Sequence, residues 1–410
     1  MLALGVAIGA VLMSCALHPT RAVAEVKLAT PADYRAMLAA LKPGDRLSLA
    51  PGVYREGLTL RGMHGTARSP IVIEGPADQS ARLPARANRN VVSLRSSSHL
   101  VIRNLLIDLG DEAVDAVKAE RSRAGVHHIV LENLMIVGRG ADQESVGIST
   151  KAPATSWRIR NNLIVGVGTG LYLGDSDGSA PFVAGIIEGN VVVNPRGYCL
   201  QIKHQIAPRE SEPTQTGRRQ TIIRRNFFSK AAGGSMDAAA RPNVLIGHLP
   251  PSGSGADDHY LVAGNVFFAN PAEALFQGEG NLNIHHNLFL NPAGPGINVR
   301  PHNAVPRRVD IRGNFVVTVG TGIHVEGVQP GFSPTVVANR VHPIGEAGRD
   351  RGGDATAADW VDYWTTLAQA VDAGPQSDLR AALRAACGGA RVPGVALIPP
   401  EHFVCAVVSR

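Results

Sequence analysis

The stretch Ile186-Ile187-Glu188-Gly189-Asn190-Val191-Val192-Val193 carries the pattern that decides the fold: alternating apolar residues, an Asn, and two or three further apolar residues. This phrase occurs nine times along the chain. Its asparagines are Asn104, Asn133, Asn162, Asn190, Asn226, Asn265, Asn287, Asn314 and Asn339. They are separated by 29, 29, 28, 36, 39, 22, 27 and 25 residues, which is the internal repeat of a solenoid protein.

A repeat of this length predicts an all-β protein built as a parallel β-solenoid, with one coil per repeat. Each coil contributes short strands in which every second residue faces the core. An Asn tolerates the left-handed backbone of a tight corner, and its amide can hydrogen-bond the Asn of the next coil, about 4.8 Å away. One coil cannot bury its apolar face alone, so the coils share a core and both ends of the stack need covers.

Both termini contain candidates for these covers. Thr30-Pro31-Ala32-Asp33 is expected to begin a short helix that reaches Leu41. Residues 355–386 have helical spacing of apolar side chains and predict a C-terminal helical capping segment. The expected organisation is a signal peptide at 1–24, a β-helix at 25–345 and the capping segment at 346–410. The two longest intervals mark insertions around residues 207–219 and 250–259, which are expected to form walls beside a binding face.

The overall composition sets further limits. The chain of 410 residues is 44% hydrophobic and 18% charged, which excludes a disordered protein. Its formal net charge of +6 suits a polyanionic partner, although ordinary solubility explains the same total. The chain has no aromatic-rich basic segment, so nucleic acid is not an expected partner. A monomer is expected.

The first residues predict export. Leu2 to Leu17 is an uncharged apolar run, and Ala22-Val23-Ala24 is a cleavage signal. Leu12-Met13-Ser14-Cys15 also resembles a lipoprotein box, but soluble export to the periplasm or medium is favoured. No other run has the length of a membrane span. In an oxidising compartment Cys387 and Cys405 are expected to form a disulfide, whereas Cys199 is expected to be a buried thiol.

Aligning the strands that follow the Asn turns predicts which side chains share a face. The expected inward pairs are Ile148/Thr150, Leu171/Leu173, Leu200/Ile202, Val244/Ile246, Leu275/Gln277, Ile297/Val299 and Ile323/Val325. One outward column then reads Ser149, Tyr172, Gln201, Leu245, Phe276, Asn298 and His324. The column after the pairs contains Lys151, Lys203 and Arg300. The next position contains Asp175, His204, His248 and Glu279.

This alignment predicts a patch around Lys203, His204 and His248, and the alternative is a merely solvated face. Lysines and arginines along a shallow face suit a polymeric uronate. The reaction that they fit is β-elimination, in which a cation neutralises the carboxylate before a base removes the adjacent proton. Lys203 is the expected base, and His204 or His248 is the acid or the alternative base. The expected substrate-binding residues are Lys151, Tyr172, Gln201, Arg300 and Glu279.

Two other chemistries compete with elimination. Hydrolysis needs paired carboxylates, but Asp175 and Glu279 are expected roughly 14 Å apart, too far for a glycosidase pair. Asp175 and Asp177 lie in a polar stretch that suits calcium, although an ordinary polar turn explains it as well. The sequence therefore predicts no obligatory cofactor and leaves calcium open.

The N-terminal part resembles a known family. Leu41-Lys42-Pro43-Gly44-Asp45-Arg46-Leu47-Ser48-Leu49-Ala50-Pro51-Gly52-Val53-Tyr54, with Gly65-Thr66 and Pro70-Ile71-Val72-Ile73 after it, is similar to the first coil of right-handed parallel β-helix polysaccharide lyases. The family includes chondroitinase B and alginate lyases. The resemblance implies a right-handed β-helix over residues 26–345.

The family's site residues transfer only in part. Lys203 stands where the resemblance places the base lysine. The next coil reads Ile246-Gly247-His248, so the family's arginine acid is absent, and Gln201 stands near an expected calcium-binding glutamate. The leading hypothesis is an exported lyase for an acidic polysaccharide. A non-catalytic binding or scaffold β-helix protein and a glycoside hydrolase are the alternatives.

Overall fold

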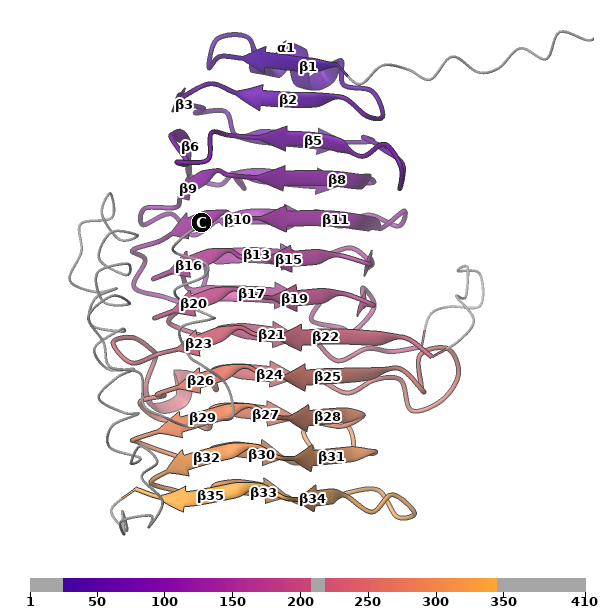
Figure 1. Cartoon of the computed structure of the whole chain (residues 1–410), viewed down its shortest axis with the longest axis vertical. Coiled ribbons are helices and arrows are strands. Elements are labelled where there is room, and N and C mark those ends of the chain that lie inside the picture. The colour runs from indigo at the N-terminus through magenta and orange to yellow at the C-terminus, as the bar shows by residue number, and fades with distance from the viewer. Residues whose placement is uncertain (1–24, 208–217, 345–410) are drawn as a thin grey trace, which may run out of the picture.

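The computed structural model describes residues 25–207 and 218–344, and these form a stack of parallel coils (Figure 1). Three parallel sheets run the length of the stack, and each coil contributes strands to them in turn. The expected right-handed parallel β-helix is confirmed. The expected signal peptide, the C-terminal helices and the pair Cys387 and Cys405 lie outside the described residues.

The sheets are named here A, B and C, and their strands are given in spatial order. Sheet A contains β1 (Val26–Ala29), β2 (Arg46–Leu49), β5 (Ile71–Glu74), β8 (Ser98–Arg103), β11 (Val126–Glu132), β15 (Arg158–Arg160), β19 (Ile186–Glu188), β22 (Gln220–Arg224), β25 (His259–Ala263), β28 (Leu282–His285), β31 (Val309–Arg312) and β34 (Thr335–Val337). Two further short strands belong to it: β14 (Ala154–Thr155) pairs with β11, and β18 (Phe182–Val183) pairs with β14. Sheet B contains β3 (Gly52–Val53), β6 (Ala81–Pro84), β9 (Leu106–Asp108), β12 (Met135–Val137), β16 (Leu163–Val165), β20 (Val191–Val193), β23 (Phe227–Ser229), β26 (Val266–Phe268), β29 (Leu288–Asn291), β32 (Phe315–Thr318) and β35 (Arg340–Pro343). Sheet C contains β4 (Leu58–Arg61), β7 (Val92–Arg95), β10 (Asp115–Ala119), β13 (Val146–Thr150), β17 (Thr169–Leu173), β21 (Leu200–Ile202), β24 (Val244–Ile246), β27 (Phe276–Gly278), β30 (Ile297–Val299) and β33 (Ile323–Val325).

Two short helices complete the described part. The helix α1 (Tyr34–Ala39) lies at the N-terminal end of the stack, where Tyr34 and Leu38 join the core (Figure 1). It is shorter than the expected helix from Thr30 to Leu41, because Thr30 and Asp33 hydrogen-bond each other in the turn that precedes it. The 3₁₀-helix η1 (Asp237–Ala239) lies in the connection between β23 and β24.

The asparagines occupy two positions of the turn rather than the single expected one. From Asn162 to Asn314 each side chain donates from Nδ2 to Oδ1 of the next asparagine, at 2.9–3.0 Å, and the series ends at Asn339. The left-handed residue of these coils is the one before, such as Asn161 or Gly189. Asn104 and Asn133 occupy that left-handed position instead. The apparent interval of 29 between Asn133 and Asn162 therefore joins two non-equivalent positions.

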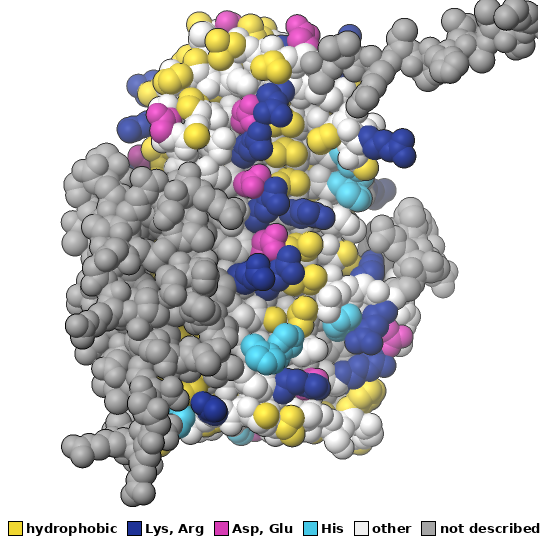
Figure 2. Space-filling model, in the orientation of Figure 1, with side chains coloured by type: hydrophobic (Ala, Val, Ile, Leu, Met, Phe, Trp, Pro, Cys, Tyr) yellow, Lys and Arg dark blue, Asp and Glu magenta, His cyan; other side chains and the backbone are white. Residues whose placement is uncertain are grey.

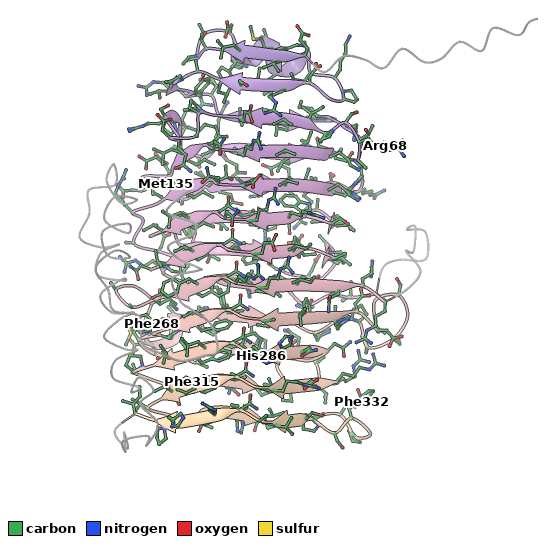
Figure 3. The ribbon with its side chains drawn as sticks, viewed as in Figure 1. Arg68, Met135, Phe268, His286, Phe315 and Phe332 are labelled. Carbon is green, nitrogen blue, oxygen red and sulfur yellow. The ribbon has the colours of Figure 1, made fainter. Side chains whose placement is uncertain are left out.

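The outer faces of the sheets differ in character. From β12 to β29 no residue of sheet B is exposed, and Met135, Phe268 and Phe315 of that sheet lie along one edge of Figure 3. Sheet A carries a column of alternating charges down the visible face of Figure 2. Sheet C carries lysines and a tyrosine in its outward positions. The predicted patch belongs to sheet C.

Candidate functional site

The strand pairing of sheet C builds the site. Ser149, Tyr172 and Gln201 are paired neighbours in β13, β17 and β21, as the alignment predicts. The next outward residues belong to the turns that follow these strands: Lys151 donates its N–H to Ala119, and Lys203 donates its N–H to Leu173. Strands of a sheet are about 4.8 Å apart, so two lysines separated by one strand share a small surface.

The side chains of Lys151 and Lys203 both lie near the ring of Tyr172. The ammonium of Lys151 lies 3.6 Å from the centre of the Tyr172 ring, and that of Lys203 lies 5.7 Å from it. Both distances are within cation–π range. Burial lowers the pKa of Lys151, although Tyr172 and Asp175 oppose this shift. The tyrosine hydroxyl is 2.7 Å from the hydroxyl of Ser176.

Glycines keep the surface on both sides of Lys203 open. A Cβ on Gly174 would lie 3.1 Å from Cβ of Lys203, and one on Gly247 would lie 2.3 Å from the backbone nitrogen of His204. These glycines precede and follow Lys203 in the outward column, so neither places a side chain beside the lysine. The coils before and after Lys203 therefore lie close to its backbone, as a larger residue at either glycine would not allow.

The two predicted histidines are neighbours. The rings of His204 and His248 stack with centres 5.3 Å apart and an angle of 26° between them. Burial lowers the pKa of His204, and His248 and Lys203 add to the shift. Nδ1 of His248 lies 3.0 Å from the carbonyl oxygen of Leu249 and must carry the hydrogen in that contact, so Nε2 is the basic atom of its neutral ring. Lys151, Tyr172, Lys203, His204 and His248 are called the sheet C patch below.

Two of the other predicted site residues are buried, and a third lies at a distance from the patch. Gln201 is buried, and Glu279 is 2% exposed, where it accepts hydrogen bonds from the backbone of His248 and Asn303. Their expected role in substrate binding has no exposed surface to act through. Glu279 supports the backbone beneath His248 instead. Arg300 is exposed but lies three strands from Lys203 along the column.

The expected alignment is wrong by one residue in the coil that contains Glu279. Phe276 and Gly278, rather than Leu275 and Gln277, pair with the inward residues of β24, and Gln277 faces outward. The ring of Phe276 fills the space inside Gly278, where a Cβ would lie 3.0 Å from it. A search for two inward apolar side chains cannot recognise a glycine in this role.

The two expected calcium ligands make separate contacts. Asp175 is buried and pairs with Arg121, whose Nη2 lies 2.6 Å from Oδ2, and with Lys151 at 3.9 Å. Asp177 is exposed and accepts hydrogen bonds from Ser179. An Asp175 already neutralised by two cations is a poor ligand for calcium, so the turn is better explained as a structural one.

Three residues of the site were missed by the sequence alignment. Asp115 of β10 accepts a hydrogen bond from Ser149 and pairs with Lys118 at 3.2 Å, and Arg121 pairs with Asp175. The alignment started one coil too late. Extending it to the inward residues Val117 and Ala119 places Lys118 in the same column as Ser149 and Tyr172.

A separate cleft lies at the N-terminal end of the stack. It has a volume of about 680 Å³ and is lined by α1, β4 and neighbouring turns, including Arg35, Glu56, Arg61 and Arg89. None of the residues of the sheet C patch lines this cleft. The five residues of the patch are partly exposed.

Comparisons with known proteins bear on the fold. No protein-family model matches the sequence, and no curated protein sequence matches it. The structure is similar to an alginate lyase from Paenibacillus sp. FPU-7, with a TM-score of 0.50, 16% identity, and coverage of 77% of this chain and 99% of that one. It is also similar to pectate lyase Pel9A (TM-score 0.49, 11% identity, 87% of each chain). A third similar structure is the GH136 lacto-N-biosidase from Eubacterium ramulus (TM-score 0.46, 13% identity, 78% of this chain and 68% of that one). At 16% identity, the likeness to the alginate lyase shows a shared fold and nothing further.

Proposed function

We propose that this protein is an exported carbohydrate-active β-helix protein that cleaves a uronate-containing polysaccharide by β-elimination at the sheet C patch. The observation that carries the proposal is the pair of ammonium groups of Lys151 and Lys203, which lie 3.6 and 5.7 Å from the centre of the Tyr172 ring, together with the stacked imidazoles of His204 and His248. An alginate lyase has the same fold, which is compatible with this chemistry. No helix of the described residues is long and apolar enough to cross a membrane.

The patch supplies each group that elimination needs. Tyr172 offers a flat face for a sugar ring, and Lys151 and Lys203 neutralise the sugar carboxylate, which makes the neighbouring C5 proton more acidic. His204 suits the role of base, because its lowered pKa keeps the imidazole neutral near pH 7. The C5–H electrons form the C4=C5 double bond, the C4–O bond breaks, and the imidazolium returns the proton to the leaving oxygen. Lys203 then acts as the neutralising cation rather than as the base.

The described carboxylates do not favour hydrolysis. Asp175 is paired with Arg121, and Glu279 is buried against backbone donors. A glycosidase needs two carboxyl groups that reach the same glycosidic bond. The predicted carboxylates of the patch cannot do so without giving up these contacts.

The test uses the purified full-length chain and a panel of uronate polymers, with and without calcium. Unsaturated ends, followed by ultraviolet absorbance, are the expected product. His204→Gln is expected to lower kcat by about 100-fold or more, in the range for loss of a general base. Lys203→Met is expected to weaken binding as well. His285→Gln, on sheet A, is the matched control and should leave both unchanged.

Three outcomes would contradict the proposal. Retention of the polymers without any product identifies a binding protein, and new reducing ends without unsaturation identify a hydrolase. A lyase activity that His204→Gln and Lys203→Met leave unchanged places the site elsewhere. The rate is expected to rise with pH through the lowered pKa of His204, since only the neutral imidazole accepts the proton.

A further inference from the structure

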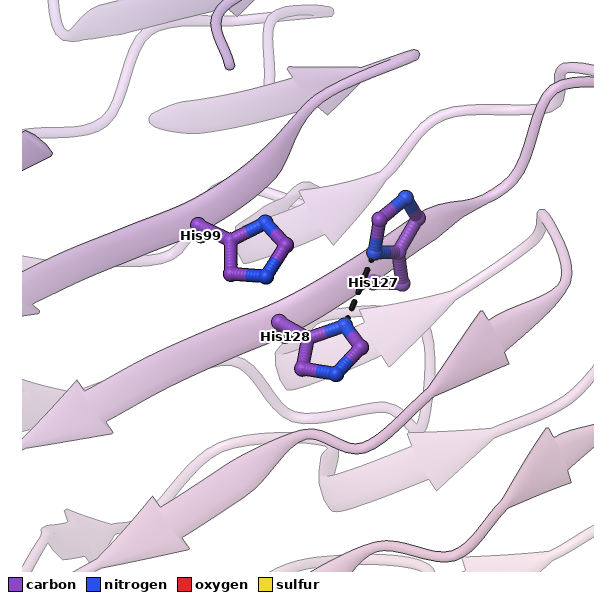
Figure 4. A group of neighbouring side chains, drawn as sticks. All are labelled: His99, His127 and His128. Atoms are coloured by element: carbon purple, nitrogen blue, oxygen red, sulfur yellow. Dashed lines mark hydrogen bonds between the residues drawn. The ribbon is translucent and has the colours of Figure 1, made fainter. Parts of the chain in front are cut away.

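Three histidines gather on a different face of the molecule, at the start of two neighbouring strands of sheet A. His99 belongs to β8, and His127 and His128 belong to β11 (Figure 4). One ring nitrogen of each lies within 4.8 Å of one ring nitrogen of each of the others. Within residues 25–207 and 218–344 this is the single group of three metal-capable side chains at such distances.

The coil geometry explains why the imidazoles meet. His127 pairs with Ser98 and Ile129 pairs with Leu100, so His128 lies beside His99. Both have a left-handed backbone, with φ of 54°. Ser156 and Ala184 adopt the same conformation in the next two coils, so the corner is a property of the fold. These two coils differ from the next two in having histidine, rather than serine or alanine, at the corner position.

The rings are arranged with their nitrogens close together. His99 and His128 stack with centres 4.5 Å apart, and His127 stands edge-on to both. Nδ1 of His127 lies 2.8 Å from Nδ1 of His128, so one donates a hydrogen and the other must be unprotonated there. Nδ1 of His99 is buried and has no hydrogen-bond partner. A buried polar atom without a partner calls for an explanation.

The contact between Nδ1 of His127 and Nδ1 of His128 also requires one of these two nitrogens to be unprotonated, so that atom presents a lone pair. The fourth nearby imidazole, His64, contacts Ser98 through Nδ1 at 3.0 Å. Neutral imidazoles present lone pairs, and metal ligands must be deprotonated to bind.

We propose that His99, His127 and His128 bind one divalent ion of the zinc type, with water in the remaining position. Imidazole suits zinc, copper and nickel, and three histidines with one open position is a common tetrahedral zinc arrangement. Bonds of about 2.0–2.1 Å require ligand nitrogens roughly 3.4 Å apart, so the two Nδ1 atoms separate by about half an ångström. The ion replaces the hydrogen bond between them and gives His99 a partner. This site is independent of the sheet C patch.

The experiment measures zinc binding to the full-length chain, prepared without a polyhistidine tag, by isothermal titration calorimetry at pH 7.5. One Zn²⁺ per chain is expected, with a higher melting temperature when zinc is present. His99→Gln is expected to weaken affinity at least 10-fold, and His127→Gln combined with His128→Gln should abolish the site. Circular dichroism without metal verifies that each variant folds.

The chain supplies its own control. His285 and His286 form a nearly identical pair, with Nδ1 atoms 2.9 Å apart and rings at 86°. Within the described residues no third ligating side chain lies close enough to this pair to complete a metal site. His285→Gln combined with His286→Gln is expected to leave the stoichiometry at one. The proposal is overturned if the wild type binds no more zinc than the variant lacking His127 and His128, or if the control loses the same ion.

Discussion

At the scale of single residues, the asparagine ladder is what ties one coil to the next. Asn226 donates from Nδ2 to the carbonyl of Ile187 and to Oδ1 of Asn265. Its own Oδ1 accepts hydrogen bonds from both the backbone and the side chain of Asn190. These groups are fully buried, so no water can replace a lost partner. Each internal asparagine of the ladder therefore makes hydrogen bonds that an apolar residue cannot make.

We expect Asn226→Ala to lower the free energy of unfolding by about 2–4 kcal/mol, because it leaves several buried groups of neighbouring coils without partners. Asn339→Ala is the matched control at the last asparagine of the series, which is only partly buried and bonds only to the preceding coil, through Asn314 and Ile311. The decrease in the free energy of unfolding should be clearly smaller for Asn339→Ala than for Asn226→Ala. Chemical denaturation followed by circular dichroism measures both, and equal losses would show that the ladder is not the source of the effect.

At the scale of elements, the outer face of sheet A is stabilised by charge alternation between strands. The paired column reads Glu74, Arg103, Glu132, Arg160, Glu188 and Arg224. Ion pairs join Arg103 to Glu74 at 2.6 Å and Arg224 to Glu188 at 2.6 Å. Residues at equivalent positions of successive coils lie side by side in the sheet. Because acidic and basic residues alternate in this column, neighbouring strands attract rather than repel each other.

Glu132→Lys would place a lysine between Arg103 and Arg160, so that three adjacent strands carry a positive charge at the paired position. The expected loss is about 1–2 kcal/mol at low ionic strength, and it should shrink in 0.5 M NaCl because these side chains are partly exposed and screened. Denaturation at both salt concentrations measures it. Glu326→Lys, which removes the exposed carboxylate beside His324, should cost less. A loss from Glu132→Lys that does not change with salt concentration would contradict the electrostatic explanation.

At the scale of the whole molecule, the two ends of the stack differ. The N-terminal end is closed by α1, which packs on β1 and β2. In the last described coil, Val336 and Val341 pair with the buried Ile311 and Val316 but are 43% and 45% exposed. Among the described residues, the core is covered by α1 at the N-terminal end, whereas these two valines of the last described coil are nearly half exposed.

Removing the same two methyl groups should therefore cost different amounts in adjacent coils. Val316→Ala is expected to destabilise the protein by roughly 2 kcal/mol, the lost transfer energy plus a cavity. Val341→Ala, in the paired position of β35, should cost less than half of that. Thermal and chemical denaturation of the two variants provide the measurement, and similar losses would mean that the last coil is as well buried in solution as the one before it.

The local pattern of residues determined the fold of this protein: the period of the Asn phrase specifies coils, and the alternation within each phrase specifies which side chains face the core. It also brought Lys151, Tyr172, Lys203, His204 and His248 to one face, because strand pairing in a solenoid follows directly from the repeat. The tertiary structure decided which of these remain accessible. Burial of Glu279, the pairing of Asp175 with Arg121, the glycine beneath Phe276 and the meeting of His99 with His127 and His128 depend on side-chain contacts between coils. The repeat brings these residues near one another, but the direction, burial and partners of each side chain depend on the packing around it, which the repeat does not specify.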